Sequence, residues 1–362
     1  MDFTLDPDLR DLRQSVGQAF AKLDAASPLT PAGRQDAWRR VAELGLLDLG
    51  PDGLDPVALA QVADELGRTR IRIPLAETVV AWRLLERLGP AEVRATLLPA
   101  ISGGTEIVAL AHAVPRAPVG TAAHGVRAER DGADRWVLTG SKEPVPYAGW
   151  ATSFLVTAVA DGETRLFLLR RDEAGVEVLD YDTHDHVGAG RVTLDGAPAA
   201  ALGGEAGTAL AEAFAAGAAV LCAEAVGAMD AALSLTVDHL RTRRQFDVTL
   251  QRFQALQHRA ADMCIELEMA RSTASYAAMA LAADPADTLA VSRAKVQVGR
   301  SGRLVGQNAI QLHGGIGITD EHPIGHYVSR LEAVEHAFGG TEIHLRELAR
   351  ALDTDASVEL LT

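Results

Sequence analysis

The run from Gln311 to Thr341 contains the residues of this chain that are best suited to holding a ligand. It begins Gln-Leu-His-Gly-Gly-Ile-Gly-Ile-Thr-Asp-Glu-His-Pro and ends Phe-Gly-Gly-Thr. Glycines let a backbone approach a flat or phosphorylated ligand closely, because no Cβ stands in the way. The tight turn at Gly339 and Gly340 carries no carboxylate that could accept a proton. The pattern therefore predicts a cofactor-binding segment without a general base of its own.

Three blocks of different periodicity must position this segment. Residues 1–105 repeat apolar side chains at helical spacing, with Gly and Pro between the repeats. Residues 106–204 change to short alternating runs, which are typical of a small antiparallel β domain. Turn pairs separate these runs at Asp131-Gly132, Thr139-Gly140, Asp161-Gly162 and Asp195-Gly196.

Residues 205–362 return to helical periodicity. The long helical segments run over roughly 207–242, 250–282, 286–314 and 322–353. We therefore expect an α+β fold that is mostly α: an N-terminal helical domain, a central antiparallel β domain and a C-terminal four-helix bundle. The bundle would carry the cofactor site and the oligomer interface.

Composition excludes several functional classes. The 362 residues are 48% hydrophobic, which supports a large core and roughly two or three domains. The net charge is -15 and no basic block occurs, so we expect no nucleic-acid surface, because phosphate backbones are bound by clustered Lys and Arg. Cys222 and Cys264 have neither disulfide nor metal-ligand spacing, so no metal site is expected. The N-terminus resembles no secretory signal, and we expect a cytoplasmic protein.

Residues 208–235 form the most membrane-like stretch of the chain. Glu212, Glu224 and Asp230 interrupt it. Carboxylates are costly in a bilayer, but a helix bundle can accommodate them at these spacings. We therefore expect a central bundle helix and no membrane association.

Several motifs of the C-terminal block together resemble those of the acyl-CoA dehydrogenase superfamily. They are Arg-Arg-Gln-Phe at 243–246, Phe-Gln-Ala-Leu-Gln at 253–257, Ala-Asp-Met at 261–263 and Gln-Leu-His-Gly-Gly-Ile-Gly at 311–317. Their order and spacing, within an α–β–α chain, are similar to those of this family over almost the whole length. The run Gly-Ile-Gly-Ile-Thr-Asp-Glu-His also resembles short, heteromeric members that act on steroid side-chain CoA thioesters.

The resemblance implies FAD as cofactor, an acyl-CoA as substrate and electron-transfer flavoprotein or a similar protein as electron acceptor. It implies that Arg243 approaches the FAD pyrophosphate, which suits a guanidinium because it stays charged and bonds phosphate oxygens bidentately. Phe246 would pack on the flavin or the adenine. The other predicted contacts are Gln254, Gln311, Gly314, Gly315 and Thr341. The first four would reach an FAD held mainly by a neighbouring subunit, so the site would exist only in an oligomer.

The residues alone leave other interpretations open. Arg243 is one of three arginines close together, and any of them could be a solvated charge at a helix end. Gln254 and Gln311 could bond neighbouring backbone, which is the usual fate of a buried amide. The glycines at 314–315 could simply end a helix. His313 could be a satisfied core or interface histidine.

The catalytic base is the sharper question. Oxidation of an acyl-CoA needs a base for the α-proton while hydride leaves the β-carbon, and a carboxylate in a dry pocket suits that task. In most of the family this base is a Glu directly before the Gly-Thr pair that is here 340–341. The resemblance therefore places it at Gly339, or at Phe338 if the loop is one residue shorter, and neither can accept a proton. Glu335 and Glu342 flank the loop and are the remaining candidates, with a surface or helix-end charge as the alternative for each.

A minority of the family carries the base on the first helix of the bundle, at the position of Gly217. Glu212 and Glu224 lie more than a helical turn away from it. For Asp320 and Glu321 we expect a structural or interface role. No catalytic residue is therefore identified in this chain.

The predicted β domain also departs from the family pattern. The Thr-Glu-Pro-type stretch that lines the flavin and the thioester is replaced by Ala-Val-Pro-Arg-Ala-Pro-Val-Gly at 113–120. Pro144 and Pro146 follow Gly-Ser-Lys at 140–142, where the family has aromatic and hydroxyl residues that contact flavin. Proline has no N–H to donate to a flavin carbonyl. The resemblance therefore implies weaker flavin contacts from this chain's own β domain.

We interpret the chain as the base-lacking subunit of a heterotetrameric, FAD-dependent acyl-CoA dehydrogenase that acts on steroid side-chain or other bulky acyl-CoA thioesters. A related subunit would supply the base, and a homo-oligomer is the alternative assembly. Two other functions are compatible with an absent base. One is a flavin-dependent oxygenase of the same fold, and the other is a non-catalytic scaffold subunit that has lost FAD.

Overall fold

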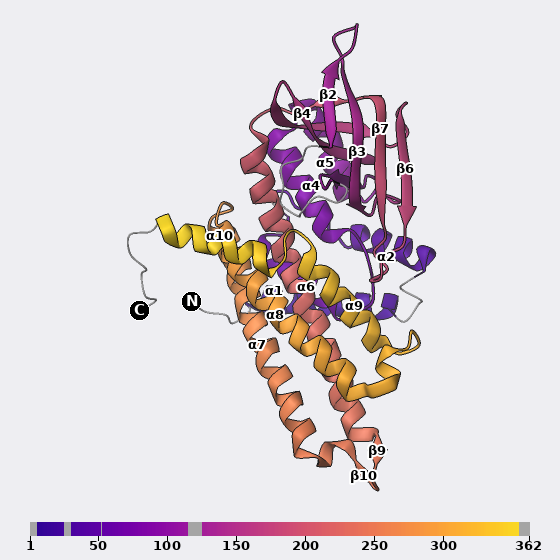
Figure 1. The fold of residues 1–362 in the computed structure, drawn as a ribbon, viewed down its shortest axis with the longest axis vertical. Coiled ribbons are helices and arrows are strands. Elements are labelled where there is room, and N and C mark those ends of the chain that lie inside the picture. Colours follow the sequence, from indigo (N-terminus) through magenta and orange to yellow (C-terminus); the bar gives the residue numbers. More distant parts are fainter. Residues whose placement is uncertain (1–5, 25–29, 52, 115–124, 355–362) are drawn as a thin grey trace. The chain divides into compact units, whose positions relative to one another are not determined.

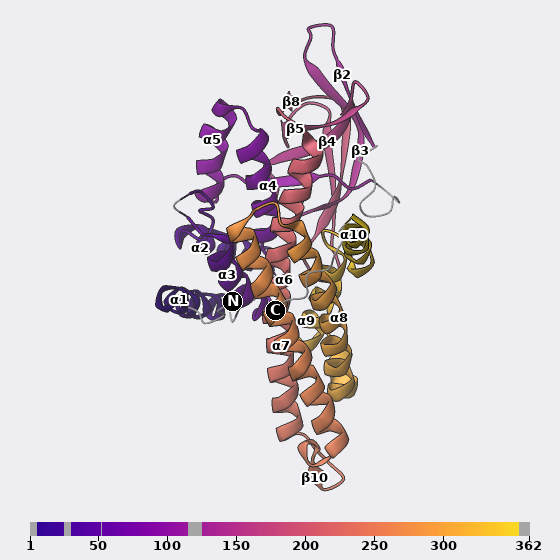
Figure 2. The ribbon, with the colours of Figure 1, turned by 90° about the vertical axis from the view of Figure 1, so that its left-hand side faces the viewer.

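A computed structural model describes residues 6–24, 30–51, 53–114 and 125–354. The chain divides into two compact units (Figures 1 and 2). We call residues 1–28, 55–71 and 218–362 the bundle unit, and residues 29–54 and 72–217 the sheet unit. Helix α6 (Ala206–Thr242) begins in the sheet unit and continues in the bundle unit.

The sheet unit is built on one sheet of 8 strands. They are β1 (Val108–Ala111), β2 (Val126–Arg130), β3 (Trp136–Pro146), β4 (Ser153–Ala160), β5 (Glu163–Arg170), β6 (Val176–Tyr181), β7 (Ala189–Pro198) and β8 (Ala200–Ala201). Their order is β6-β7-β3-β2-β4-β5-β8, with β1 beside β4. Most neighbours are antiparallel, whereas β1 and β2 each pair with β4 in parallel. All of these strands fall within residues 106–204, although the predicted domain boundaries stay predictions. Helices of the same unit are α2 (Pro31–Glu43), α4 (Leu75–Leu88) and α5 (Ala91–Ser102).

Strand β4 is the best buried strand of the sheet, and its Phe154 and Val156 lie in the unit's hydrophobic core. It forms a hairpin with β5 through Asp161-Gly162, as predicted, and both turn residues have positive φ (53° and 82°). The turns predicted at Thr139-Gly140 and Asp195-Gly196 are wrong, because both pairs lie inside strands. Gly140 stands at a register shift where a Cβ would lie 2.0 Å from the Gly125 carbonyl oxygen, so glycine is needed within the strand.

The bundle unit contains the remaining helices. They are α1 (Pro7–Asp24), α3 (Pro56–Gly67), most of α6, α7 (Gln254–Ala283), α8 (Thr288–His313), α9 (Pro323–His336) and α10 (Thr341–Thr354). Helices α7, α8 and α9 run alongside one another, and a hairpin of β9 (Arg244–Gln245) and β10 (Val248–Thr249) joins α6 to the short η1 (Leu250–Arg252) before α7 (Figures 1 and 2). The short η2 (Gly314–Ile318) follows α8.

The segment predicted as one helix over 322–353 is two helices. Between α9 and α10, Phe338 and Gly339 have φ values of 53° and 100°, which a right-handed helix does not contain. The turn they form is the one predicted to lack a carboxylate, at the position where the catalytic base is expected.

Helix α6 packs very closely against α3. A Cβ on Gly67 would lie 1.8 Å from the carbonyl oxygen of Glu224, and one on Gly227 would lie 1.9 Å from that of Asp64. The small residues of α6 are therefore explained by packing. By length and composition α6 could cross a membrane, but 78% of its apolar window is buried inside the protein, as in the core helix of a globular protein.

Candidate functional site

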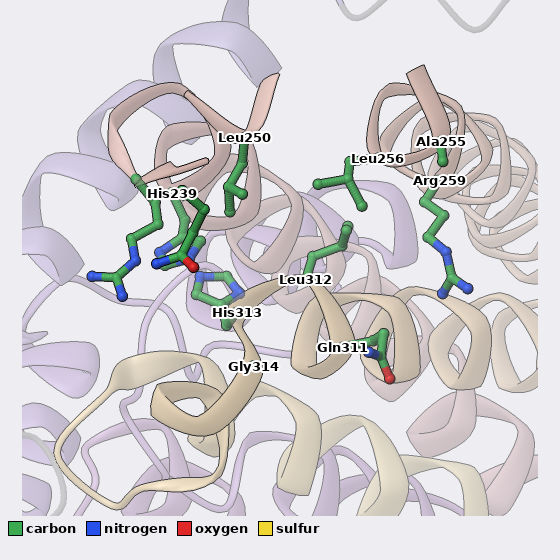
Figure 3. A pocket seen from close by; sticks show the side chains of 11 residues that line it. His239, Leu250, Ala255, Leu256, Arg259, Gln311, Leu312, His313 and Gly314 are labelled. Atoms are coloured by element: carbon green, nitrogen blue, oxygen red, sulfur yellow. The ribbon is translucent and has the colours of Figure 1, made fainter. Parts of the chain in front are cut away.

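One end of the bundle unit holds a pocket with a volume of about 540 Å³. It is formed where α6 ends, α7 begins and α8 ends (Figure 3). Its lining residues are His239, Arg243, Gln245, Leu250, Ala255, Leu256, Arg259, Gln311, Leu312, His313 and Gly314. In Figure 3, Leu256 and Leu312 lie between His239 and His313 on one side and Arg259 and Gln311 on the other. An apolar middle with polar ends suits an elongated ligand that carries hydrogen-bonding or charged groups.

Arg243 brings a positive charge to this pocket. Its N–H donates to the carbonyl of His239 (2.9 Å) and its carbonyl accepts from the N–H of Leu250 (2.9 Å), so the backbone is held just past the end of α6. Within the described residues its guanidinium makes no ion pair, whereas Arg241 and Arg244 are engaged by neighbours on their own segments. Of these three arginines, Arg243 lines the pocket, which is the distinction that the sequence pattern left open.

Gln311 and Gly314 lie at the same pocket, at the end of α8. Gly314 caps the helix with a φ of 65°, a left-handed conformation that favours glycine. No heavy atom lies within 4 Å of the place where a Cβ on Gly314 or Gly315 would stand. The glycine pair therefore ends the helix and also leaves its backbone open to a ligand, so the two interpretations of the motif are compatible.

Four other predicted cofactor contacts are not part of the pocket lining. Phe246 is 84% exposed on the β9–β10 hairpin, and its ring lies edge-on to a second phenylalanine at 6.1 Å. Gln254 is exposed at the first position of α7, and Gly315 is exposed after α8. Thr341 begins α10, where its N–H donates to Oε1 of Glu335 (2.9 Å). Their roles toward a cofactor stay predictions, and Phe246 and Gln254 would act on a ligand or subunit outside this chain.

His239 and Arg259 line the pocket but are not indicated by the sequence motifs. His239 lies four residues before Arg243, a spacing that places two side chains on one helix face, so this signal was available. Arg259 Nη1 donates to Asn308 Oδ1 (3.0 Å) and thereby joins α7 to α8. Because that contact depends on how two helices pack, no local pattern predicts it.

The turn between α9 and α10 is held in a form that suits glycine. At Gly339 the φ of 100° is one that L side chains rarely adopt, and a Cβ would lie 3.1 Å from Nε2 of His344. The same Nε2 donates to the carbonyl of Phe338 (3.2 Å). From α8, the buried Lys295 donates through Nζ to three backbone carbonyls at the end of α9, at 2.7, 3.3 and 2.9 Å. A side chain of α10 and one of α8 thus fix the turn where the base is expected.

Neither glutamate beside this turn lines the pocket. Glu335 is buried, and its Oε1 accepts a hydrogen bond from the Thr341 N–H at the start of α10. The positive N-terminal end of the helix dipole also stabilises a carboxylate there. A Cβ on Gly299 would lie 1.9 Å from Oε2 of Glu335, so α8 needs a glycine beside it. Glu342 is 86% exposed and pairs with Arg346 at 3.4 Å. Glu342 therefore lies at the surface, and Glu335 binds the start of α10 through Oε1, while its buried Oε2 has no hydrogen-bond partner among the described residues. The naming of either as a base stays a prediction.

The glutamates of α6 are engaged by arginines. Glu224 is 4% exposed, and its two oxygens accept from Nε and Nη2 of Arg330 at 2.7 and 2.9 Å. Glu212 is paired with Arg87. Gly217 is buried and has no side chain to offer. Each carboxylate near the alternative base position therefore already has a structural partner.

The sheet unit places Pro144 and Pro146 in strand β3, after the fully buried Lys142. Lys142 Nζ donates to the carbonyl of His112 (3.2 Å), and burial lowers the pKa of this lysine to about 8. Burial and then the charge of Lys142 lower the pKa of His112 to about 4. The altered stretch at 113–120 lies outside the described residues from 115 onward, so the loss of flavin contacts there stays a prediction.

Comparison with known proteins extends the similarity over the whole chain. Residues 206–352 match the family model for the acyl-CoA dehydrogenase C-terminal domain. Over 340 residues, which are 88% of this chain and 88% of the relative, the sequence is 30% identical to acyl-CoA dehydrogenase FadE27 of Mycobacterium tuberculosis.

Two solved structures show the same fold. A chain of a Tcur3481-Tcur3483 steroid ACAD variant superimposes with a TM-score of 0.85 and 31% identity, over 97% of this chain and 99% of that one. A chain of the ChsE4-ChsE5 complex from Mycobacterium tuberculosis gives a TM-score of 0.85 and 26% identity, over 99% and 100%. These relatives confirm the predicted fold class and the resemblance to short steroid-type members. The chain therefore belongs to the acyl-CoA dehydrogenase family of flavin oxidoreductases, which act on CH–CH bonds.

Proposed function

We propose that this chain is the base-lacking subunit of a hetero-oligomeric, FAD-dependent acyl-CoA dehydrogenase. It would hold part of an FAD in the pocket beside Arg243, while a related chain supplies the general base. The observation that carries this proposal is the turn at Gly339.

Dehydrogenation at the α and β carbons requires a group that accepts the α-proton. Gly339 offers none, and its left-handed backbone and the nearby His344 Nε2 oppose any side chain there. Glu335 caps α10, and Glu342 is exposed and paired with Arg346. A proton acceptor from outside this chain meets the need.

The pocket has the donor set that a diphosphate-containing cofactor needs. Arg243 has no ion pair within the described residues, and the backbone at Gly314 is open where a Cβ would stand. The buried Nε2 of His313 has no hydrogen-bond partner in the described part of the chain, so a ligand could satisfy it. Arg243 would bond phosphate oxygens, the amide of Gln311 would orient the ligand, and the leucines of the pocket would exclude water. Bound FAD would supply the hydride acceptor for the CH–CH oxidation.

The proposed assembly and substrate are supported by the relatives. Both structural relatives are named as pairs of chains, and one of them is named a steroid enzyme. We extend the pairing and the steroid substrate to this chain, with a related subunit as partner and a steroid side-chain or other bulky acyl-CoA as substrate. Electron-transfer flavoprotein or a similar protein as acceptor and a cytoplasmic location complete the proposal.

Purification of the chain alone and together with a related acyl-CoA dehydrogenase chain tests the proposal. We expect no acyl-CoA-dependent dye reduction by the chain alone, and both flavin absorbance and turnover in the complex. An Arg243→Met change should lower the flavin content of the complex, whereas Arg241→Met should not, because Arg241 pairs with Asp238 and does not line the pocket.

Ordinary turnover by the homogeneous chain would refute the proposal. So would a complex that remains folded but loses all activity when Glu335→Gln or Glu342→Gln is introduced. Oxygen consumption with reduced flavin and no CoA-thioester binding would favour the oxygenase, and absence of flavin both alone and in the complex would favour the scaffold.

A further inference from the structure

Three imidazole rings stand in a row at the Arg243 end of the pocket. The ring centroids of His239 and His313 are 4.6 Å apart, and those of His313 and His322 are 4.8 Å apart. The rings come from α6, from α8 and from the residue before α9. Both His239 and His313 line the pocket, as Figure 3 shows.

The middle ring has a fixed tautomer and an unused nitrogen. Nδ1 of His313 lies 2.8 Å from the carbonyl of Ala309, which can only accept, so Nδ1 carries the proton. The residue is 6% exposed, and among the described residues its buried Nε2 has no hydrogen bond of ordinary geometry, although the carbonyl of Leu235 also acts on the ring and raises its pKa. A buried nitrogen of this kind normally has a partner. The sequence also allows His313 to be a core or interface histidine with its hydrogen bonds satisfied. Its Nδ1 has such a hydrogen-bond partner, whereas its Nε2 has none of ordinary geometry among the described residues.

The charged residues that line the pocket are positive. Arg243 follows α6 and acts on His239, whereas Arg259 comes from α7 and lies on the opposite side of the pocket. The acidic residues nearest in sequence to the histidines and these arginines are exposed: Asp238, Asp247, Asp262, Asp320 and Glu321. The pKa of His239 is lowered by burial, then by His322 and Arg243. The pKa of His313 is lowered by burial and by His239 and His322, whereas the backbone carbonyls of Ala309 and Leu235 raise it.

We propose that His239 and His313 act with Arg243 as a proton-coupled diphosphate site, with the ring of His322 packed beside them: the imidazoles of His239 and His313 are neutral in the free protein and take up a proton when the anion binds. The inference rests on the proposed function, because it assigns these residues to the diphosphate of the same cofactor. An anion beside the row favours the imidazolium form, and a protonated Nε2 of His313 becomes the donor that a phosphate oxygen needs. Binding therefore tightens as the pH falls through the histidine range.

Isothermal titration calorimetry with ADP-ribose tests this assignment. ADP-ribose carries a diphosphate diester that does not itself titrate in the neutral range, so protons taken up come from the protein. Titrations of the subunit complex after removal of its flavin, in two phosphate-free buffers of different ionisation enthalpy, give the number of protons bound. We expect uptake of about 0.5–1 proton per ADP-ribose, and an affinity that rises roughly 10- to 100-fold from about pH 8 to about pH 6.

Two substitutions and one control separate the outcomes. His313→Asn and His239→Asn should each reduce the proton uptake and flatten the pH dependence, and either suffices if the other misfolds. His336→Asn is the control, because this exposed histidine pairs with Glu332 and lies outside the pocket lining. Binding with no proton uptake, or with uptake unchanged in both variants, would overturn the inference while leaving the proposed function intact. No binding of ADP-ribose or FAD at any pH would overturn the proposed function itself.

Discussion

The buried ion pair between Glu224 and Arg330 gives the sharpest test of how this bundle is built. Both side chains are nearly inaccessible, at 4% and 7% exposure, and two charge-assisted hydrogen bonds of 2.7 and 2.9 Å join them. An Arg330→Met change would leave the carboxylate of Glu224 buried without its partner. Removal of one member of such a pair costs about 3–5 kcal/mol, because the remaining charge is neither paired nor solvated. We expect a loss of this size in the free energy of unfolding.

The double variant Glu224→Gln with Arg330→Met removes both charges. It should be more stable than Arg330→Met alone, since no uncompensated charge remains. Arg346→Met is the matched control: its partner Glu342 is 86% exposed at 3.4 Å, and such a pair contributes only about 0–1 kcal/mol.

Urea unfolding distinguishes the two units of this chain. All 4 tryptophans lie in the sheet unit, so their fluorescence reports that unit, whereas far-UV ellipticity also reports the helices of the bundle unit. Arg330→Met should shift the ellipticity transition to lower urea, with Arg346→Met close to wild type. The reasoning is refuted if Arg330→Met unfolds at the same urea concentration as the control Arg346→Met. It is also refuted if the double variant is less stable than Arg330→Met alone.

Three further predictions concern single positions. Gly339→Ala should lower the free energy of unfolding by about 1–3 kcal/mol, because the φ of Gly339 is 100°. Gly340→Ala should cost far less, because its Cβ would meet only ordinary contacts at 3.5 Å. Equal urea midpoints of the two variants would contradict the strain at Gly339. For His112, with its pKa lowered from 6.5 to about 4, the unfolded chain binds more protons between these values, so stability falls as the pH falls through this window by roughly 3 kcal/mol. Melting temperatures at the two ends of the window should therefore differ less in His112→Asn than in wild type, and an unchanged difference would rule out this linkage. Phe246→Ser should leave the melting temperature of the isolated chain unchanged, because the ring is 84% exposed. The same change should weaken association with the partner subunit, as measured by sedimentation velocity. A marked drop in melting temperature would show that the ring is needed for folding.

Local patterns were sufficient for most of the elements. Apolar side chains at helical spacing predicted the helical character of residues 1–105 and the long helix α6, and a Pro at the first turn marks the starts of α2, α3 and α9. The turn at Asp161-Gly162 was also readable, because both residues tolerate positive φ. The pairs Thr139-Gly140 and Asp195-Gly196 have similar composition but lie within strands. There the glycine of Thr139-Gly140 serves a close backbone approach between strands, which is a property of strand pairing and not of the local sequence.

The sequence by itself determined the family and the absence of a carboxylate at position 339, because both depend on residue identities in a fixed order. Tertiary structure alone decided which arginine lines the pocket, that Glu224 is neutralised by Arg330, and that His239, His313 and His322 form one row. Each of these facts joins residues on different helices, or depends on which way a helix face points. Spacing along one segment cannot report such contacts, since they are set by the packing of segments far apart in the chain.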